Sequence, residues 1–231
     1  MNKRLILGSP IDELLDRLYA KSAGQSQELT SYFSAWAEEP SFNRDRRFDA
    51  RTNQFLSDKL VAIDRDKGEF CYQICRALGA RRVVEAGTSF GVSTLFLAGA
   101  VRDNRRQNCG DGVVIGTEYE PQKARVARAT FAEASLSEFI DLREGDIRDT
   151  LVDLAFPVDF MLVDIWAPMA RPALEMVAPR LRTGAVVICD NTEQFREAYR
   201  EYFEFVHDPA NHFRTMTLPF EGGLEFTVRT D

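Results

Sequence analysis

Apolar residues recur at helical spacing through the first third of the chain, and short β-branched runs replace this pattern after it. The helical spacing, with apolar residues three and four positions apart, covers residues 11–21, 28–39, 52–63 and 67–78. Pro40 follows the second stretch and Gly79 the fourth, and both residue types commonly end helices. The pattern predicts an N-terminal helical extension over residues 1–78.

From Arg82 onward, short apolar runs alternate with helical stretches. Runs typical of buried parallel strands lie at 83–84, 113–115, 140–143, 158–163 and 185–189. Helices are predicted between them, beginning at residue 92 and spanning 121–134, 169–181 and 191–205. Residues 213–218 and 224–229 alternate around Glu221-Gly222-Gly223, which indicates a hairpin. We therefore expect one domain over 1–231, whose α/β core, 79–231, is a Rossmann-like, doubly wound sheet of seven strands, mostly parallel with the last antiparallel.

A glycine turn joins the first strand of this core to the next helix. Gly87 and Gly91 lie four positions apart, so the Gly-x-Gly-x-x-Gly spacing of dinucleotide-binding turns is absent. Such a turn lets the backbone approach a ligand closely and directs helix N–H groups at its negative end. Glu85, at the end of the strand, suits a ligand that carries an ammonium group, such as S-adenosylmethionine. An ordinary βα turn of an α/β protein remains the alternative.

Each of the five predicted parallel strands has an acid at or just after its end, and the fifth also has an amide. They are Glu85, Glu118, Asp146, Asp164, Asp190 and Asn191. Ligands of open α/β sheets bind at the carboxyl ends of the strands, where these side chains stand. A carboxylate after the second strand suits the ribose hydroxyls of an adenosine, and Asp146 and Tyr119 suit the adenine.

Three of these residues also suit a metal. Asp164, Asp190 and Asn191 offer oxygen ligands of the kind that Mg²⁺ prefers. The alternatives are ordinary ones: Asp190 and Asn191 would cap the next helix, and Glu118 would be a solvated loop residue.

Composition narrows the possible partners and the compartment. The 231 residues carry a net charge of −7 and a pI near 5.1, which argues against nucleic acid and anionic membrane. The four cysteines, Cys71, Cys75, Cys109 and Cys189, form no Cys-x-x-Cys pair, so free thiols and a cytoplasmic location are expected. No apolar run has transmembrane length, and the N-terminal run is too short for a signal peptide.

Several segments together resemble a known family. They are Val-Val-Glu-Ala-Gly-Thr-Ser-Phe-Gly-Val-Ser-Thr, Gly-Thr-Glu-Tyr-Glu-Pro, Glu-Gly-Asp, Leu-Val-Asp-Ile-Trp, Val-Ile-Cys-Asp-Asn and Gly-Gly-Leu-Glu. In this order they look like the class I S-adenosylmethionine-dependent O-methyltransferases, nearest to the catechol and caffeoyl-CoA type. The resemblance covers about residues 60–230, and Lys67-Gly68 matches a Lys-Gly of the catechol enzymes.

The resemblance implies roles for individual residues. Those implied to bind the cofactor are Glu85, Gly87, Ser89, Ser93, Glu118, Tyr119, Gly145, Asp146, Asp164 and Trp166. Those implied to bind Mg²⁺ or another divalent cation are Asp164, Asp190 and Asn191, and Asp164 is also the expected catalytic residue.

The acceptor side departs from the catechol pattern. Ala167 stands where those enzymes have a lysine base, Ile165 where they have a histidine, and Met216 where a glutamate holds the catechol. The resemblance thus implies S-adenosylmethionine-dependent O-methylation of a small phenolic or other hydroxyl-bearing molecule, with the general base unassigned. A non-catalytic cofactor-binding protein, an N-methyltransferase and, less favoured, a nicotinamide-dependent oxidoreductase remain alternatives.

The extension is expected to serve assembly or closure of the site. Leu29, Phe33 and Trp36 share one stripe of the second predicted helix, which is more apolar surface than a peripheral helix needs. A homodimer, or a lid over the site, follows as an expectation.

Overall fold

The computed structural model describes residues 6–37, 50–108 and 110–231, and it contains two compact units that divide between Ala62 and Ile63. Two expectations lie outside the described residues: the helix end at Pro40 and the state of Cys109. The side chain of Trp36 is also outside them. Among the described residues, no helix is long and apolar enough to cross a membrane.

The first unit contains three helices, α1 (Ser9–Gly24), α2 (Ser26–Ala37) and α3 (Ala50–Leu56). The prediction of a helix over 52–63 is wrong in its second half, because side chains hold the backbone beyond α3. Gln25, between α1 and α2, accepts a hydrogen bond from the Leu60 N–H at 2.8 Å. Tyr32 of α2 stacks on Phe55 of α3 with ring centroids 3.7 Å apart, and its ring also meets that of Phe33, a member of the predicted stripe, at 5.3 Å.

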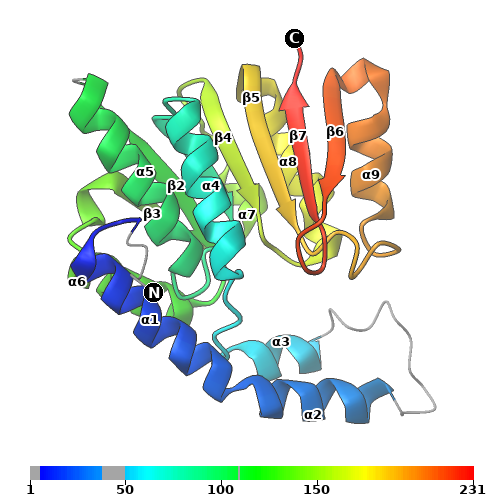
Figure 1. Ribbon diagram of the computed structural model, residues 1–231. Coiled ribbons are helices and arrows are strands. Elements are labelled where there is room, and N and C mark those ends of the chain that lie inside the picture. The colour runs from blue at the N-terminus through cyan, green and yellow to red at the C-terminus, as the bar shows by residue number, and fades with distance from the viewer. Residues whose placement is uncertain (1–5, 38–49, 109) are drawn as a thin grey trace. The chain divides into compact units, whose positions relative to one another are not determined.

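The second unit is built on a sheet of seven strands. They are β1 (Arg82–Ala86), β2 (Val113–Glu118), β3 (Ile140–Glu144), β4 (Val158–Val163), β5 (Leu181–Asp190), β6 (Phe213–Leu218) and β7 (Leu224–Arg229). Their order is β3-β2-β1-β4-β5-β7-β6, and only β7 runs against the others, as its arrow in Figure 1 shows. The predicted doubly wound sheet is confirmed.

Helices cover both faces of this sheet. They are α4 (Arg65–Ala77), α5 (Val92–Asn108), α6 (Pro121–Glu133), α7 (Ile147–Thr150), α8 (Ala167–Val177) and α9 (Arg200–His207). Figure 1 shows α4 in front of the sheet and α8 behind it. Central strand residues such as Val84, Phe160 and Val187 are fully buried, as expected for strands covered on both faces. Because α4 packs on α5, it belongs with the sheet rather than with the three preceding helices.

The predicted helix over 191–205 is wrong in its first half. Asn191 has φ of +58°, a left-handed conformation that stops helical continuation after β5. After Thr192, the N–H groups of Glu193 and Gln194 both donate to the Gly222 carbonyl at 2.9 Å. The turn between β6 and β7 therefore holds this segment in place, and α9 begins only at Arg200.

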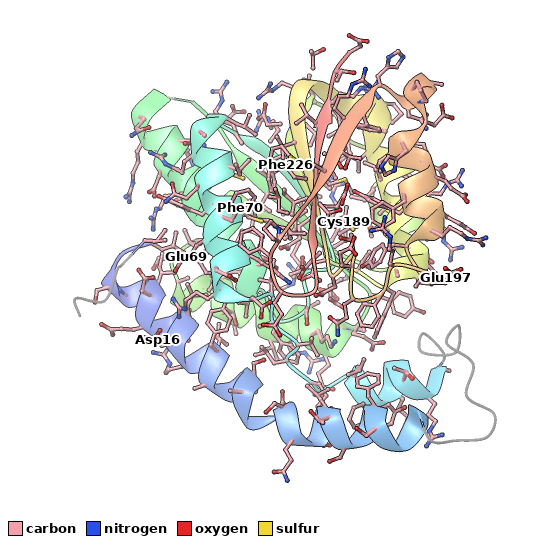
Figure 2. The ribbon with its side chains drawn as sticks, turned by 45° about the vertical axis from the view of Figure 1, so that its right-hand side comes forward. Asp16, Glu69, Phe70, Cys189, Glu197 and Phe226 are labelled. Atoms are coloured by element: carbon pink, nitrogen blue, oxygen red, sulfur yellow. The ribbon has the colours of Figure 1, made fainter. Side chains whose placement is uncertain are left out.

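The parallel strands bring their carboxyl ends together at one edge of the sheet. In register, Ala86 of β1 lies beside Thr117 of β2 and Val163 of β4, and Val163 lies beside Cys189 of β5. The residues that follow these positions are those predicted to bind a ligand. α4 lies over β7 near this edge, where Phe70 meets Phe226 with ring centroids 6.4 Å apart (Figure 2).

Candidate functional site

Glu85 is a buried carboxylate with one free oxygen. Its Oε2 accepts hydrogen bonds from the hydroxyls of Thr88 (2.7 Å) and Thr94 (2.6 Å). Its Oε1 is also buried but has no hydrogen-bond partner among the described residues. Burial raises the pKa of Glu85, and the hydroxyls of Thr94 and Thr88 only partly oppose this. A buried acceptor without a donor fits a ligand that supplies an N–H group.

The turn after Glu85 needs its two glycines. Gly87 has φ of +94°, and a Cβ there would lie 2.0 Å from the Asp164 carbonyl oxygen. Gly91 has φ of +90°, and a Cβ there would lie 2.4 Å from the Phe131 ring. Both positions require a residue without a side chain, because the backbone conformation and the neighbours exclude one. The turn therefore lies directly against the end of β4.

Glu118 joins the turns that follow β1 and β2. Its Oε2 accepts from the Ser89 N–H at 2.7 Å, and its Oε1 accepts from the Glu120 N–H at 2.8 Å. These two bonds fix the carboxylate at the strand end while leaving further lone pairs for a ligand. Tyr119, the next residue, is 70% exposed, so its ring is available at the surface. Ser93, at the start of α5, is buried close to Glu85.

Asp146 already has a partner within the chain. It caps α7, and its carboxylate accepts hydrogen bonds from the backbone N–H and the guanidinium of Arg148. These bonds lower the pKa of Asp146 to about 2. Gly145, with φ of +127°, donates its N–H to the Glu118 carbonyl at 2.9 Å and so ties this turn to β2. The structure thus places both residues beside Glu118, with Asp146 in a capping role.

The three predicted metal ligands differ in their contacts. Asp164 is partly exposed, and its carboxylate makes no hydrogen bond or ion pair within the described residues. Asp190 is nearly buried, and its Oδ1 accepts from the Asn191 N–H at 2.7 Å and from the Lys67 ammonium at 2.8 Å. Its Oδ2 meets only the Asn191 amide, at 3.3 Å. Cys189, the residue before Asp190, is labelled on β5 in Figure 2.

Negative charge accumulates at this end of β4 and β5. Burial raises the pKa of Asp164 well above its ordinary value, and the charges of Asp190 and Glu85 raise it further. Burial also raises the pKa of Asp190, against the opposing effect of Lys67. Carboxylates that are costly to ionise in the absence of a counter-charge favour a bound cation.

The donor set fits a hard cation. Two carboxylates and one amide oxygen are the ligand types that Mg²⁺ takes, and Asp164 has no competing partner among the described residues. Among those residues, no group of three or more His, Cys, Asp or Glu side chains is arranged to hold a metal. The predicted set contains two such residues and an asparagine. The metal therefore stays a prediction that the chemistry of Asp164, Asp190 and Asn191 supports.

The structure shows where the residues that depart from the catechol pattern lie. Ala167 is the first residue of α8, and it is buried, with Ile165 and Trp166 just before it. Met216 lies on β6, the edge strand, and is 59% exposed. No lysine stands at the start of α8. Among the residues that the structure describes, Lys67 is the one buried lysine at the site. The sequence did not predict its contacts, although Lys67-Gly68 contributed to the resemblance.

The sequence is similar to those of known methyltransferases. A family model described as a methyltransferase domain matches residues 84–192. The catechol O-methyltransferase of Mycobacterium tuberculosis is 32% identical over 132 residues, and that of Niastella koreensis is 27% identical over 135. Over the matched residues the chain is similar to these enzymes, which supports a class I O-methyltransferase family. The resemblance found in the sequence is thereby confirmed. The alignments cover 57% of this chain in both cases, and only 57% and 58% of the two catechol O-methyltransferases.

Solved structures confirm the methyltransferase fold over more of the chain. An O-methyltransferase of Streptomyces achromogenes involved in tomaymycin synthesis, solved with S-adenosylmethionine, superposes with a TM-score of 0.68 at 21% identity. The match covers 88% of this chain and 96% of that one. At this identity the likeness establishes the fold alone, so the ligands and reaction of this chain have to follow from its own residues.

Proposed function

We propose that this methyltransferase transfers the methyl group of S-adenosylmethionine to an oxygen of a small, hydroxyl-bearing acceptor. The observation that carries the proposal is the buried Oε1 of Glu85, which has no donor among the described residues and stands at the end of β1 beside the Gly87 turn. The cofactor's amino group would supply the missing donor. Relatives named catechol O-methyltransferase, and a fold neighbour solved with this cofactor, support the choice.

The proposed cofactor site extends along the ends of β1, β2 and β3. Glu85, Gly87, Ser89 and Ser93 would hold the methionyl part, which is an amine and a carboxylate in one group. Glu118 would accept hydrogen bonds from the ribose hydroxyls, because its carboxylate is fixed by two backbone N–H groups and keeps lone pairs free. The residues proposed to surround the adenine are Tyr119, Gly145, Asp146 and Trp166.

The proposed reaction is a displacement at carbon. A lone pair of the acceptor oxygen forms the new C–O bond, the S–CH₃ bond breaks, and its electron pair stays on sulfur as S-adenosylhomocysteine. The hydroxyl proton leaves to water or to a group of the acceptor, since Ala167 offers no base. The chain's contribution is to align oxygen, methyl and sulfur and to exclude water.

Asp164 is the proposed catalytic residue, because its partly exposed carboxylate has no other partner among the described residues. With Asp190 and Asn191 it would hold a divalent cation at the acceptor side. Such a cation, when bound, lowers the pKa of an acceptor hydroxyl and orients it.

Assembly and location are also proposals. A homodimer remains the proposed state, with the first three helices contributing to its interface or to a lid. Light scattering near 26 kDa at micromolar concentration would count against the dimer. A cytoplasmic location rests on the thiols of Cys71, Cys75 and Cys189, which are buried and form no disulfide.

Calorimetry with S-adenosylhomocysteine and with NAD tests the proposed cofactor. We expect one S-adenosylhomocysteine per chain and no heat from NAD. NAD binding at this site would instead favour the oxidoreductase alternative. Absence of binding by either ligand to the folded chain would remove the proposed function.

A further inference from the structure

Lys67 is a lysine that the proposed reaction does not use, although it contacts Asp190 and Asn191 of the proposed cation site. Its side chain is 1% exposed, and its ammonium contacts three acceptors. These are Asp190 Oδ1 at 2.8 Å, Asp64 Oδ2 at 3.1 Å and Asn191 Oδ1 at 3.4 Å. An ammonium has three N–H donors, so these contacts use its full capacity. Two of the three acceptors belong to residues proposed to bind a divalent cation.

The surrounding packing fixes the helix that carries Lys67. A Cβ on Gly68, the next residue, would lie 2.6 Å from the Phe96 ring, so α4 lies tightly against α5 at this point. On its other side α4 contacts the β6–β7 hairpin through Phe70, whose ring centroid is 5.3 Å from that of Phe220. The backbone of Lys67 is therefore held beside the end of β5, from which its ammonium reaches Asp190 and Asn191.

The Lys67 ammonium lies among several carboxylates, so its charge affects any cation that binds there. Asp190 and Glu85 are buried, Asp164 lies beside them, and Lys67 is the positive group that opposes their effects on Asp164. The ammonium is paired with two carboxylates, those of Asp190 and Asp64, which favour its charged form. A divalent cation on the same ligands would meet this ammonium at close range, and like charges at such distances repel strongly.

We propose that Lys67 is a resident cation of this methyltransferase, which holds Asp190 and Asn191 together and, by competing for their oxygens, sets a low affinity for divalent ions. The Asp164 carboxylate and Asp190 Oδ2 remain for a divalent ion, while Asp190 Oδ1 and Asn191 Oδ1 are shared with the ammonium. Divalent binding then requires Lys67 to yield Asn191, and the bound ion exchanges readily. This inference rests on the proposed cation site and deepens it.

Binding of Mn²⁺, followed by calorimetry and by its electron paramagnetic resonance signal without cofactor or acceptor, tests this proposal. Lys67→Met removes the charge and keeps a chain of similar length. We expect it to bind Mn²⁺ at least about tenfold more tightly than the unaltered chain, because one nearby positive charge is gone. Lys67→Arg keeps the charge and should stay within about threefold.

Two controls keep the result specific. Lys59 is another nearly buried lysine, paired with Glu28 and Asp58 in the first unit, so Lys59→Met should leave Mn²⁺ affinity unchanged. Thermal unfolding and S-adenosylhomocysteine binding report whether each variant folds, and Lys67→Gln replaces Lys67→Met if the latter does not.

The outcomes separate this proposal from the proposed function. Equal or weaker Mn²⁺ binding by a folded neutral variant overturns the role of Lys67, and so does a failure of every variant to bind Mn²⁺. In either case S-adenosylhomocysteine binding still tests the methyltransferase assignment independently, because Glu85 and Glu118 lie on other strands.

Discussion

Glu85 and Glu118, on the proposed cofactor side of the site, are held differently from Asp164 and Asp190, on the proposed acceptor side. At the ends of β1 and β2, Glu85 and Glu118 accept two hydrogen bonds each, from threonine hydroxyls and from backbone N–H groups. At the end of β4, Asp164 has no such donor among the described residues. At the end of β5, Asp190 accepts from the Asn191 N–H and from the Lys67 ammonium.

This difference indicates two kinds of binding region. The cofactor side is preorganised, because its charged groups are positioned before any ligand arrives. The acceptor side carries buried negative charge that one ammonium only partly offsets, so it gains most from a further cation. Substitutions should therefore separate the two regions, affecting affinity for the cofactor in one and the rate of methyl transfer in the other.

The largest effect is expected at Asp190. Asp190→Asn keeps the shape of the side chain but removes its charge. It should lower turnover by roughly 10²–10³-fold, because the bound cation that activates the acceptor hydroxyl would be lost. Affinity for S-adenosylhomocysteine should change by less than about threefold, because Asp190 lies outside the proposed cofactor site. Turnover is measured as S-adenosylhomocysteine release with and without EDTA. EDTA should lower the turnover of the unaltered chain as much as the Asp190→Asn substitution does. Glu144→Gln, at the end of β3, is the matched control, and full turnover in EDTA would argue against a cation.

Gly87 joins the two regions, so its substitution should damage both. In Gly87→Ala the new Cβ would meet the Asp164 carbonyl oxygen at a backbone φ of +94°, and we expect a loss of about 2–4 kcal/mol of unfolding free energy. Gly145→Ala is the control, since its φ is +127° but its nearest neighbour, the Thr150 methyl group, is 3.7 Å away. Urea unfolding should rank Gly87→Ala clearly below Gly145→Ala, and equal stabilities would mean that the close approach to β4 is unimportant.

Glu118 tests the cofactor side alone. Glu118→Ala should weaken S-adenosylmethionine binding by about 1.5–3 kcal/mol, the usual value of hydrogen bonds to a charged group. Glu120→Ala is matched to it, because it removes a neighbouring carboxylate but keeps the backbone N–H that bonds Glu118. Calorimetry showing unchanged affinity in Glu118→Ala would take Glu118 out of the ribose role.

The smallest effect concerns pH. Burial raises the pKa of Glu85 above its ordinary value of 4.5, so the carboxylate becomes neutral at a higher pH than a solvated glutamate. As the pH falls through this raised pKa, the attraction for the cofactor's ammonium is lost, and affinity should fall by up to about tenfold. Glu85→Gln should bind weakly at every pH, without this inflection. An inflection that survives in Glu85→Gln would belong to another group.

The sequence predicted the sheet and the meeting of its strand ends well, for a physical reason. Short β-branched runs, a glycine turn and an acid at each strand end are local signals, and the parallel topology then brings the strand ends together. Glu85 and Glu118 could thus be proposed as neighbours although 32 residues separate them. Their bonding partners, Thr88 and the Ser89 N–H, were not predictable, because rotamers and turn conformation decide those bonds.

The errors arose where distant contacts override a local pattern. Residues 191–199 have helical periodicity, but Asn191 takes a left-handed conformation and the next residues bond to Gly222. The stretch after Leu56 is held by Gln25, over thirty residues earlier. Lys67 likewise meets Asn191 across 124 positions, which no spacing in the sequence reveals.

Product analysis tests the central claim most directly. The chain is incubated with S-adenosylmethionine carrying a ¹³C-labelled methyl group and a panel of small phenols, vicinal diols and amines. The account predicts a product with the label on oxygen, in amounts equal to the S-adenosylhomocysteine released. Cofactor binding with no product from any acceptor, or a label found only on nitrogen, would contradict it.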